Sequence, residues 1–240
     1  MSASSIQTWV AIIGALLTAL VGLLQYFRYR SRRDRMAEVG AAFTATVESL
    51  ASDNEIERMA AAVLLRRFFD RSTEQGAGKA PYKRETVEVI AGLLRQATPG
   101  LFQKVLADGL RYAQNLDSVD LQGCNLQDAY LGRKQGDKRG LDLSNADLWR
   151  ADCARASFRD VKAKHTVFSE AGLEDAVFIG AELQMANFRR ARLSNAQFSG
   201  AKIEGACFMG ADGVPKEVSE LLDDDFVGLP RAEVGRGVSV

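Results

Sequence analysis

Histidine and cysteine, on which many catalytic and metal sites depend, are scarce in this sequence. Its 240 residues include one His, His165, and three Cys. A single imidazole excludes zinc sites built on several histidines, and three cysteines without a C-x-x-C spacing form neither a disulfide framework nor a cysteine-rich metal site. We therefore expect reduced thiols, no bound metal and no cofactor.

Proline is also scarce, and neither sign of charge is in excess. The chain has 4 Pro, 47% hydrophobic residues, and 31 basic against 31 acidic residues. This composition is not that of a disordered chain. The balanced charge gives no argument for a nucleic-acid partner, so none is expected.

Charge is absent from residues 1–27, where Trp9–Phe27 form an almost continuous apolar run. About 20 such residues cross the hydrocarbon core of a bilayer. Basic residues follow at once, namely Arg28, Arg30, Arg32, Arg33 and Arg35. A secretory signal peptide would carry its positive charge before the apolar run.

This pattern predicts a transmembrane helix with a basic cytoplasmic flank over residues 1–35, contacting the lipid bilayer through residues 6–27. By the positive-inside rule the N-terminus lies outside and everything after the helix is cytoplasmic. We expect a single-pass protein of a bacterial inner membrane. The alternative interpretation is a buried core helix of a soluble domain.

Small residues recur every four positions within the apolar run: Gly14, Ala15, Thr18, Ala19 and Gly22. Such a stripe lets two transmembrane helices approach closely. Gly and Ala are common in any membrane span, so a homo-oligomer and a stripe without a partner both stay open.

Residues 36–113 are expected to form a small α-helical spacer domain. The first helix should continue to about Ala51, and Ser52 with Glu55 three residues later forms a capping-box start for the next helix. Thr98 and Pro99 are a suitable cap and first-turn pair for the last helix. The charged residues of this region show no catalytic or metal-ligand spacing.

A five-residue period occupies the following hundred residues. From Leu143 onward an apolar residue stands at every fifth position, usually with Ala two positions before it. The larger members of this series, which we predict to form the core, are Leu148, Phe158, Phe168, Leu173, Phe178, Leu183, Phe188, Leu193, Phe198, Ile203 and Phe208. The same pattern begins upstream near Val119, and residues 132–140 shift its register, which predicts an inserted loop.

A period of five fits neither a helix nor a strand, so the chain must turn repeatedly with two of every five residues facing inward. Residues twenty apart also match, as in Phe158, Phe178 and Phe198. Four fives should therefore make one square coil, with Phe stacked on Phe along two opposite walls.

Units such as ADLWR, AELQM, ANFRR, ARLSN and AQFSG resemble the repeats of pentapeptide-repeat proteins. The resemblance covers residues 114–213 and implies a right-handed quadrilateral β-helix. The predicted fold class is thus a mainly β solenoid preceded by a single transmembrane helix and a small α-helical domain. Residues 214–226 are expected to form a C-terminal capping helix, and residues 227–240 a flexible tail.

Solenoid surfaces bind other molecules more often than they enclose a reaction. No catalytic residue is expected, so we predict a protein that is not an enzyme but an interaction platform for an unidentified protein partner. The outward-facing candidates for partner contact are Trp149, Ile179 and Met209, the loop residues Arg133, Lys134, Lys138 and Arg139, and a cluster of Arg189, Arg190 and Arg192.

Two other functions are weighed against this one. Some pentapeptide-repeat proteins imitate DNA and protect gyrase, but residues 114–213 hold 14 acidic and 13 basic residues, too little net charge to imitate a duplex. An oligomerising membrane effector, acting through the small-residue stripe, is the second alternative.

Overall fold

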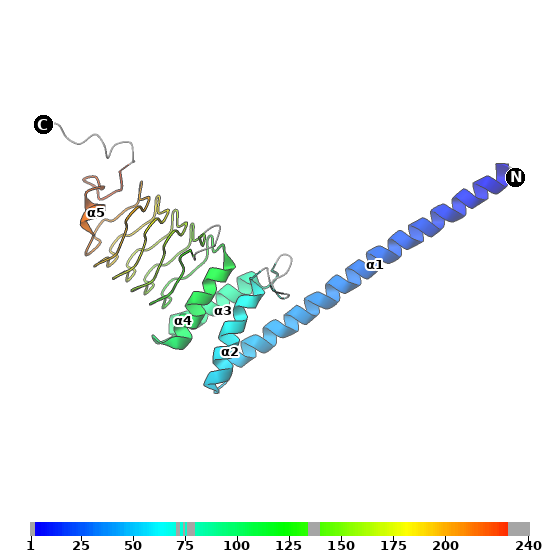
Figure 1. The fold of residues 1–240 in the computed structure, drawn as a ribbon, viewed down its shortest axis with the longest axis horizontal. Helices are drawn as coiled ribbons and strands as arrows, with labels where there is room; N and C mark the ends of the chain where they lie inside the picture. Colours follow the sequence, from blue (N-terminus) through cyan, green and yellow to red (C-terminus); the bar gives the residue numbers. More distant parts are fainter. Residues whose placement is uncertain (1–2, 71–72, 74, 76–79, 134–139, 230–240) are drawn as a thin grey trace. The chain divides into compact units, whose positions relative to one another are not determined.

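A computed structural model of the chain describes residues 3–70, 73, 75, 80–133 and 140–229, without the side chains of residues 3–19, 27, 28 and 32. The chain divides into two compact units, residues 1–45 and residues 46–240. The first consists of most of one long helix, and the second holds shorter helices and the repeat region (Figure 1).

Helix α1 runs without interruption from Ala3 to Leu50, where the sequence has no proline to break it. No helix in the part of the chain described above is both long and apolar enough to cross a membrane. The side chains of residues 6–19, which include Gly14, Ala15, Thr18 and Ala19 of the small-residue stripe, lie outside the described residues. The predicted span is therefore represented by its last part only.

Three further α-helices and two short 3-10 turns form the helical region of the second unit. They are α2 (Glu55–Leu65), η1 (Arg66–Phe68), α3 (Lys83–Gln96), α4 (Leu101–Gly109) and η2 (Leu110–Ala113). Their shared core holds fully buried side chains of Leu65, Phe68, Ile90, Leu94, Leu106 and Leu110. The predicted apolar face of α3, with Val87, Ile90 and Leu94, is buried as expected, whereas α2 buries Ala61, Ala62 and Leu65 and not the predicted face that includes Ile56 and Leu64.

The helix starts differ from the predicted ones by a few residues. Asn54, not Ser52, is the N-cap of α2, and its Oδ1 accepts hydrogen bonds from the backbone N–H groups of Ile56 and Glu57. Ser52 instead donates its hydroxyl to Glu57 at 2.7 Å. Helix α4 begins at Leu101, after Thr98 and Pro99. An Asx cap therefore replaces the expected capping box.

The repeat region is a β-helix whose coils are joined by single parallel bridges rather than by extended strands in the described residues. One residue of each five forms the bridge, and bridged residues are 20 apart, as in Asp142, Lys162, Glu182 and Lys202. Between the first two coils the spacing is 27, as from Asn115 to Asp142. The extra length belongs to the inserted loop, of which residues 134–139 lie outside the described part of the chain.

Phenylalanine side chains fill the interior in two parallel stacks, as predicted. Phe158, Phe178 and Phe198 stack at centroid distances of 4.9 Å. Phe168, Phe188 and Phe208 stack at 5.0 and 4.8 Å. Rings of the two stacks meet edge to face, for example at 5.6 Å between Phe168 and Phe178. These offset and T-shaped contacts are the arrangements that aromatic pairs prefer.

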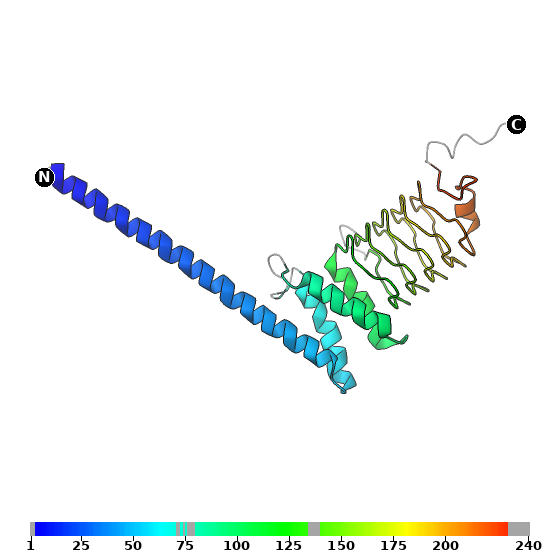
Figure 2. The ribbon, with the colours of Figure 1, turned by 180° about the vertical axis from the view of Figure 1, so that it is seen from behind.

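The helical region lies directly against the first coil (Figures 1 and 2), so it is a cap of the β-helix and not only the expected spacer. The buried Gln103 amide donates to the carbonyls of Asn125 and Gln127 at 3.0 and 3.1 Å. Lys104 donates to the carbonyl of Asp128. Helices α3 and α4 thereby satisfy backbone groups that an uncovered solenoid end would expose.

The other end is covered by residues 214–229. Helix α5 (Lys216–Ser219) brings Glu217 to the backbone N–H of Phe198, which donates to it at 2.9 Å. Val227 then pairs antiparallel with Cys207. The predicted cap is in the right place, but only Lys216–Ser219 of the predicted helix over residues 214–226 are helical. The predicted tail starts too early, because Val227–Leu229 belong to the cap; residues 230–240 lie outside the described chain.

Candidate functional site

The outward surface of the β-helix is made of four ridges, one along each corner of the coils. Each corner is a β-turn such as Leu148–Ala151, in which the N–H of Ala151 donates to the carbonyl of Leu148 at 3.0 Å. The third residue of this turn, Arg150, has a φ of 55°, as type II turns require. The second and third turn residues therefore form the ridges.

One ridge brings together four of the residues predicted to contact a partner. Backbone hydrogen bonds link its coils in order, from Arg150 N to the carbonyl of Ser169, from Glu170 N to that of Arg189, and from Arg190 N to that of Met209. We call this surface the Trp149 ridge; its residues are Trp149, Arg150, Ser169, Glu170, Arg189, Arg190 and Met209. Trp149, Arg189, Arg190 and Met209 thus lie along one edge within four consecutive coils, the second of which carries Ser169 and Glu170.

Trp149 is fixed in place although 36% of it is exposed. Its backbone N–H donates to Asp147 at 2.9 Å, and the Arg150 guanidinium lies 4.2 Å from the centre of its ring. Arg150 in turn pairs with Glu170 at 2.7 Å, and this hydrogen bond lowers the pKa of Glu170 below its usual value. The ridge therefore presents a preorganised aromatic side chain.

The Trp149 ridge carries three arginines against one glutamate. Arg189 donates through Nε to the Cys207 sulfur at 3.2 Å, and neither Arg189 nor Arg190 has a carboxylate within ion-pair distance among the residues that the structure describes. On another ridge, by contrast, Arg155 binds both oxygens of Asp128 at 2.7 and 2.8 Å and lowers the Asp128 pKa. Positive charge is thus left available on the Trp149 ridge.

The other predicted contact residues lie elsewhere. Ile179 stands on a different ridge, on which Arg133 pairs with Asp160 at 3.3 Å. Arg192 lies on a wall between ridges and pairs with Glu174, so the predicted cluster of three arginines is divided. Lys134, Lys138 and Arg139 lie outside the described residues.

Two features of the ridge were missed in the sequence. Trp149, Ser169, Arg189 and Met209 are spaced by 20 residues, so the coil period already contained the signal that groups them. Phe226, 53% exposed, was not considered, although its carbonyl accepts from the N–H of Phe208, the residue before Met209. It lies beyond the repeats, where the period gives no information.

The described residues include no group of three or more His, Cys, Asp or Glu side chains placed to hold a metal ion. His165 takes the third position of a corner turn, with a φ of 57°. Burial raises the pKa of the Cys124 thiol to about 11 and that of Cys153 above its usual value. These two thiols are therefore poor nucleophiles at neutral pH.

Comparison with known proteins identifies the repeats. The family model described as pentapeptide repeats matches eight copies, over residues 139–175, 157–195 and 171–210. This match confirms the resemblance for that region and, with it, the right-handed β-helix typical of the family. No curated protein matches the chain.

Two solved structures of pentapeptide repeat proteins are similar to part of the chain. One, from the cyanobacterium Cyanothece 51142, has 27% identity, covering 41% of this chain and 80% of that chain, with a TM-score of 0.29. The other, from Nostoc Pcc 7120, has 25% identity, covering 45% and 85%, with a TM-score of 0.32.

Proposed function

We propose that this chain, whose residues 139–210 carry pentapeptide repeats, is a membrane-anchored, non-enzymatic platform that binds an acidic protein surface through the Trp149 ridge. The observation that carries the proposal is that Trp149, Arg189, Arg190 and Met209 lie along one edge within four consecutive coils. Trp and Arg are the side chains most enriched at energetic centres of protein interfaces.

The rigidity of the β-helix supports such a role. Each coil is bonded to the next through its backbone, and the interior is filled by stacked rings. Side chains on the ridge are thus held in place before a partner arrives, which lowers the entropy lost on binding. Arg189 and Arg190, which have no carboxylate at ion-pair distance among the described residues, favour an acidic partner, because complementary charge speeds and orients association.

The membrane anchor rests on the sequence of residues 6–27 and on the arginines that follow it. Supporting it, the described end of the run exposes about half of each apolar side chain at Leu20, Val21, Leu23 and Leu24. A helix that is apolar all round needs either protein or lipid around it. We assign the protein to a bacterial inner membrane, with its β-helix in the cytoplasm.

Site-specific photo-crosslinking in the native membrane tests the platform. A photoreactive phenylalanine analogue at Met209 should form protein adducts, and the same analogue at Ile179, on another ridge, should not. Combining the Met209 probe with Arg189→Ala and Arg190→Ala should reduce the adducts. Equal adducts from both positions, or adducts with lipid only, would contradict binding through the Trp149 ridge.

The alternative function, an oligomerising membrane effector, predicts a different effect of substitutions in the membrane helix. Its activity would depend on close helix packing, so replacing Gly14, Thr18 and Gly22 by Leu should abolish it. The platform tolerates these substitutions, because its helix only places the β-helix at the membrane. Unchanged Met209 adducts in this triple variant therefore favour the platform, and their loss favours the effector.

A further inference from the structure

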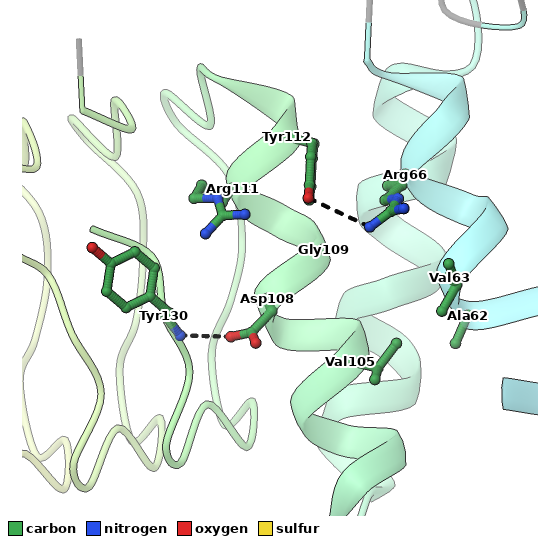
Figure 3. A pocket seen from close by; sticks show the side chains of 9 residues that line it. All are labelled: Ala62, Val63, Arg66, Val105, Asp108, Gly109, Arg111, Tyr112 and Tyr130. Atoms are coloured by element: carbon green, nitrogen blue, oxygen red, sulfur yellow. Dashed lines mark hydrogen bonds between the residues drawn. The ribbon is translucent and has the colours of Figure 1, made fainter. Parts of the chain in front are cut away.

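A cavity of about 480 Å³ lies between the helical cap and the first coil of the β-helix (Figure 3). Its size falls in the range of roughly 300–1,000 Å³ that is usual for small-molecule sites. It is lined by Ala62 and Val63 of α2, Arg66 of η1, Val105, Asp108 and Gly109 of α4, Arg111 and Tyr112 of η2, and Tyr130 of the first coil.

Two arginines are held in this cavity by aromatic rings rather than by carboxylates. The guanidinium groups of Arg66 and Arg111 each lie 5.0 Å from the centre of the Tyr112 ring, which stands between them in Figure 3. Arg111 also lies 5.6 Å from the centre of the Tyr130 ring. Within the described part of the chain, neither has a carboxylate at ion-pair distance.

Their N–H groups therefore remain available to an anion. Among the residues that the structure describes, Arg66 donates one long hydrogen bond, of 3.4 Å, to the Tyr112 hydroxyl. A guanidinium stacked on an aromatic face still offers its donors at the edge, in a fork that matches a carboxylate.

Asp108 is the one acid among the described residues of the cavity lining, and it already accepts a hydrogen bond. Its Oδ1 accepts the backbone N–H of Tyr130 at 2.6 Å, which ties α4 to the first coil (Figure 3). The described lining residues thus carry two separate positive charges and one negative charge, a balance that suits a dianion better than a highly charged bisphosphate.

Beside Tyr112 and the two arginines, the rest of the described lining is mostly apolar (Figure 3). Ala62, Val63 and Val105 provide aliphatic surface, and Gly109 has no side chain. A Cβ built on Gly109 would meet no atom within 4 Å, so this position borders empty space.

We propose that this cavity binds a small dicarboxylate, with its two carboxylates at Arg66 and Arg111 and its hydrocarbon linker passing Gly109. The site does not depend on the platform function proposed above. It lies between the helical cap and the first coil and shares no residue with the Trp149 ridge.

Calorimetric titration of the full-length chain in phosphatidylcholine nanodiscs tests the site. The probes are succinate, adipate and suberate, with hexanoate as the analogue of adipate that lacks one carboxylate. The best dicarboxylate should bind at least about tenfold more tightly than hexanoate, the loss expected for one charge-assisted interaction. Absence of binding by all three dicarboxylates, or equal binding of hexanoate, would overturn the proposal.

Three variants locate the binding. Arg66→Gln and Arg111→Gln should each lower the affinity for the best dicarboxylate about tenfold. Arg67 is exposed and lies beside the cavity without lining it, so Arg67→Gln should leave that affinity unchanged. Gly109→Leu should abolish binding with an unchanged or higher Tm, because Leu suits a helix and would occupy the open space. Binding retained in Gly109→Leu, or weakened equally by Arg67→Gln, would place the ligand elsewhere and refute the site.

Discussion

The three cysteines differ in environment because they take different positions of the five-residue unit. Cys124 and Cys153 point inward and are fully buried, and the Cys124 sulfur lies 3.5 Å from the carbonyl of Ala91 in α3. Cys207 lies on an outer wall and is partly exposed. The reactivity of each thiol should therefore follow its position in the repeat.

We expect one of the three thiols to react in the folded protein. Titration with a disulfide reagent at neutral pH should modify Cys207 rapidly and leave Cys124 and Cys153 unmodified until the chain unfolds. Cys207→Ser should remove the fast reaction, and all thiols should react in denaturant. Rapid modification of two thiols in native protein would mean that the coils open more readily than their packing indicates.

Alkaline pH should lower the free energy of unfolding through Cys124. Burial raises its pKa from 9.0 to about 11 in the folded protein, so the unfolded chain loses this proton first. The stability is complete below the ordinary pKa of 9.0 and falls as pH rises toward 11, by at most about 1.4 kcal/mol per pH unit.

Urea unfolding of the wild type and of Cys124→Ala at several pH values between neutral and strongly alkaline measures this loss. Ala is the usual residue at the position of Cys124 in the repeat, so the variant should fold normally and lose less stability at high pH. Identical pH profiles for the two proteins would show that burial of this thiol contributes nothing to the alkaline loss.

At the scale of elements, the two Phe stacks should dominate the stability of the β-helix. Phe178 stacks on Phe158 and Phe198 at 4.9 Å and meets Phe168 and Phe188 edge to face. Phe178→Ala should lower the free energy of unfolding by about 3–5 kcal/mol, because the coils above and below cannot close around the missing ring.

Urea unfolding followed by circular dichroism checks this value. The exposed Gln197→Ala, on the outer wall beside the same stack, serves as the control and should change stability by less than about 0.5 kcal/mol. A loss below about 1 kcal/mol in Phe178→Ala would show that the coils re-form around a smaller side chain.

The N-terminal cap should depend on a buried amide. Gln103 is 2% exposed and holds two carbonyls of the first coil. Gln103→Ala should therefore cost about 1–3 kcal/mol of unfolding free energy, since it leaves buried acceptors unpaired. Gln96→Ala, at the exposed end of α3, is the matched control. Equal losses of unfolding free energy from the two substitutions would show that the Gln103 hydrogen bonds do not stabilise the cap.

The coils were predictable from the sequence and the N-terminal cap was not, for a physical reason. Within each group of five residues, the sequence alone determines the turn and which side chains face inward. Phe178 or Leu183 could therefore be placed inside from spacing alone. Gln103 instead acts on backbone more than twenty residues away, and its type and spacing resemble those of a surface residue. The Trp149 ridge is an intermediate case. The five-residue period places its residues on the outside, but grouping them on one edge also requires that four fives close into one coil.

For the whole molecule, the two caps decide whether the β-helix can extend by self-association. At the C-terminal end, the carbonyl of Phe226 accepts the N–H of Phe208, and Gly228 exchanges hydrogen bonds with Gly205 and Ala206. These bonds use backbone groups that a further coil would need. Uncovered solenoid ends and sheet edges pair readily with other chains.

Removing residues 215–240 should therefore make the protein associate end to end, in a concentration-dependent way. Light scattering coupled to size-exclusion chromatography, in one detergent for all forms, measures the change. A form lacking only residues 230–240 keeps the paired segment and should match the full chain. Because all three forms share α1, any association through that helix is common to them, and only the difference reports on the end of the β-helix. If both deletions behave alike, residues 215–229 do not protect that end, and the charged side chains of the last coil must keep the molecules apart.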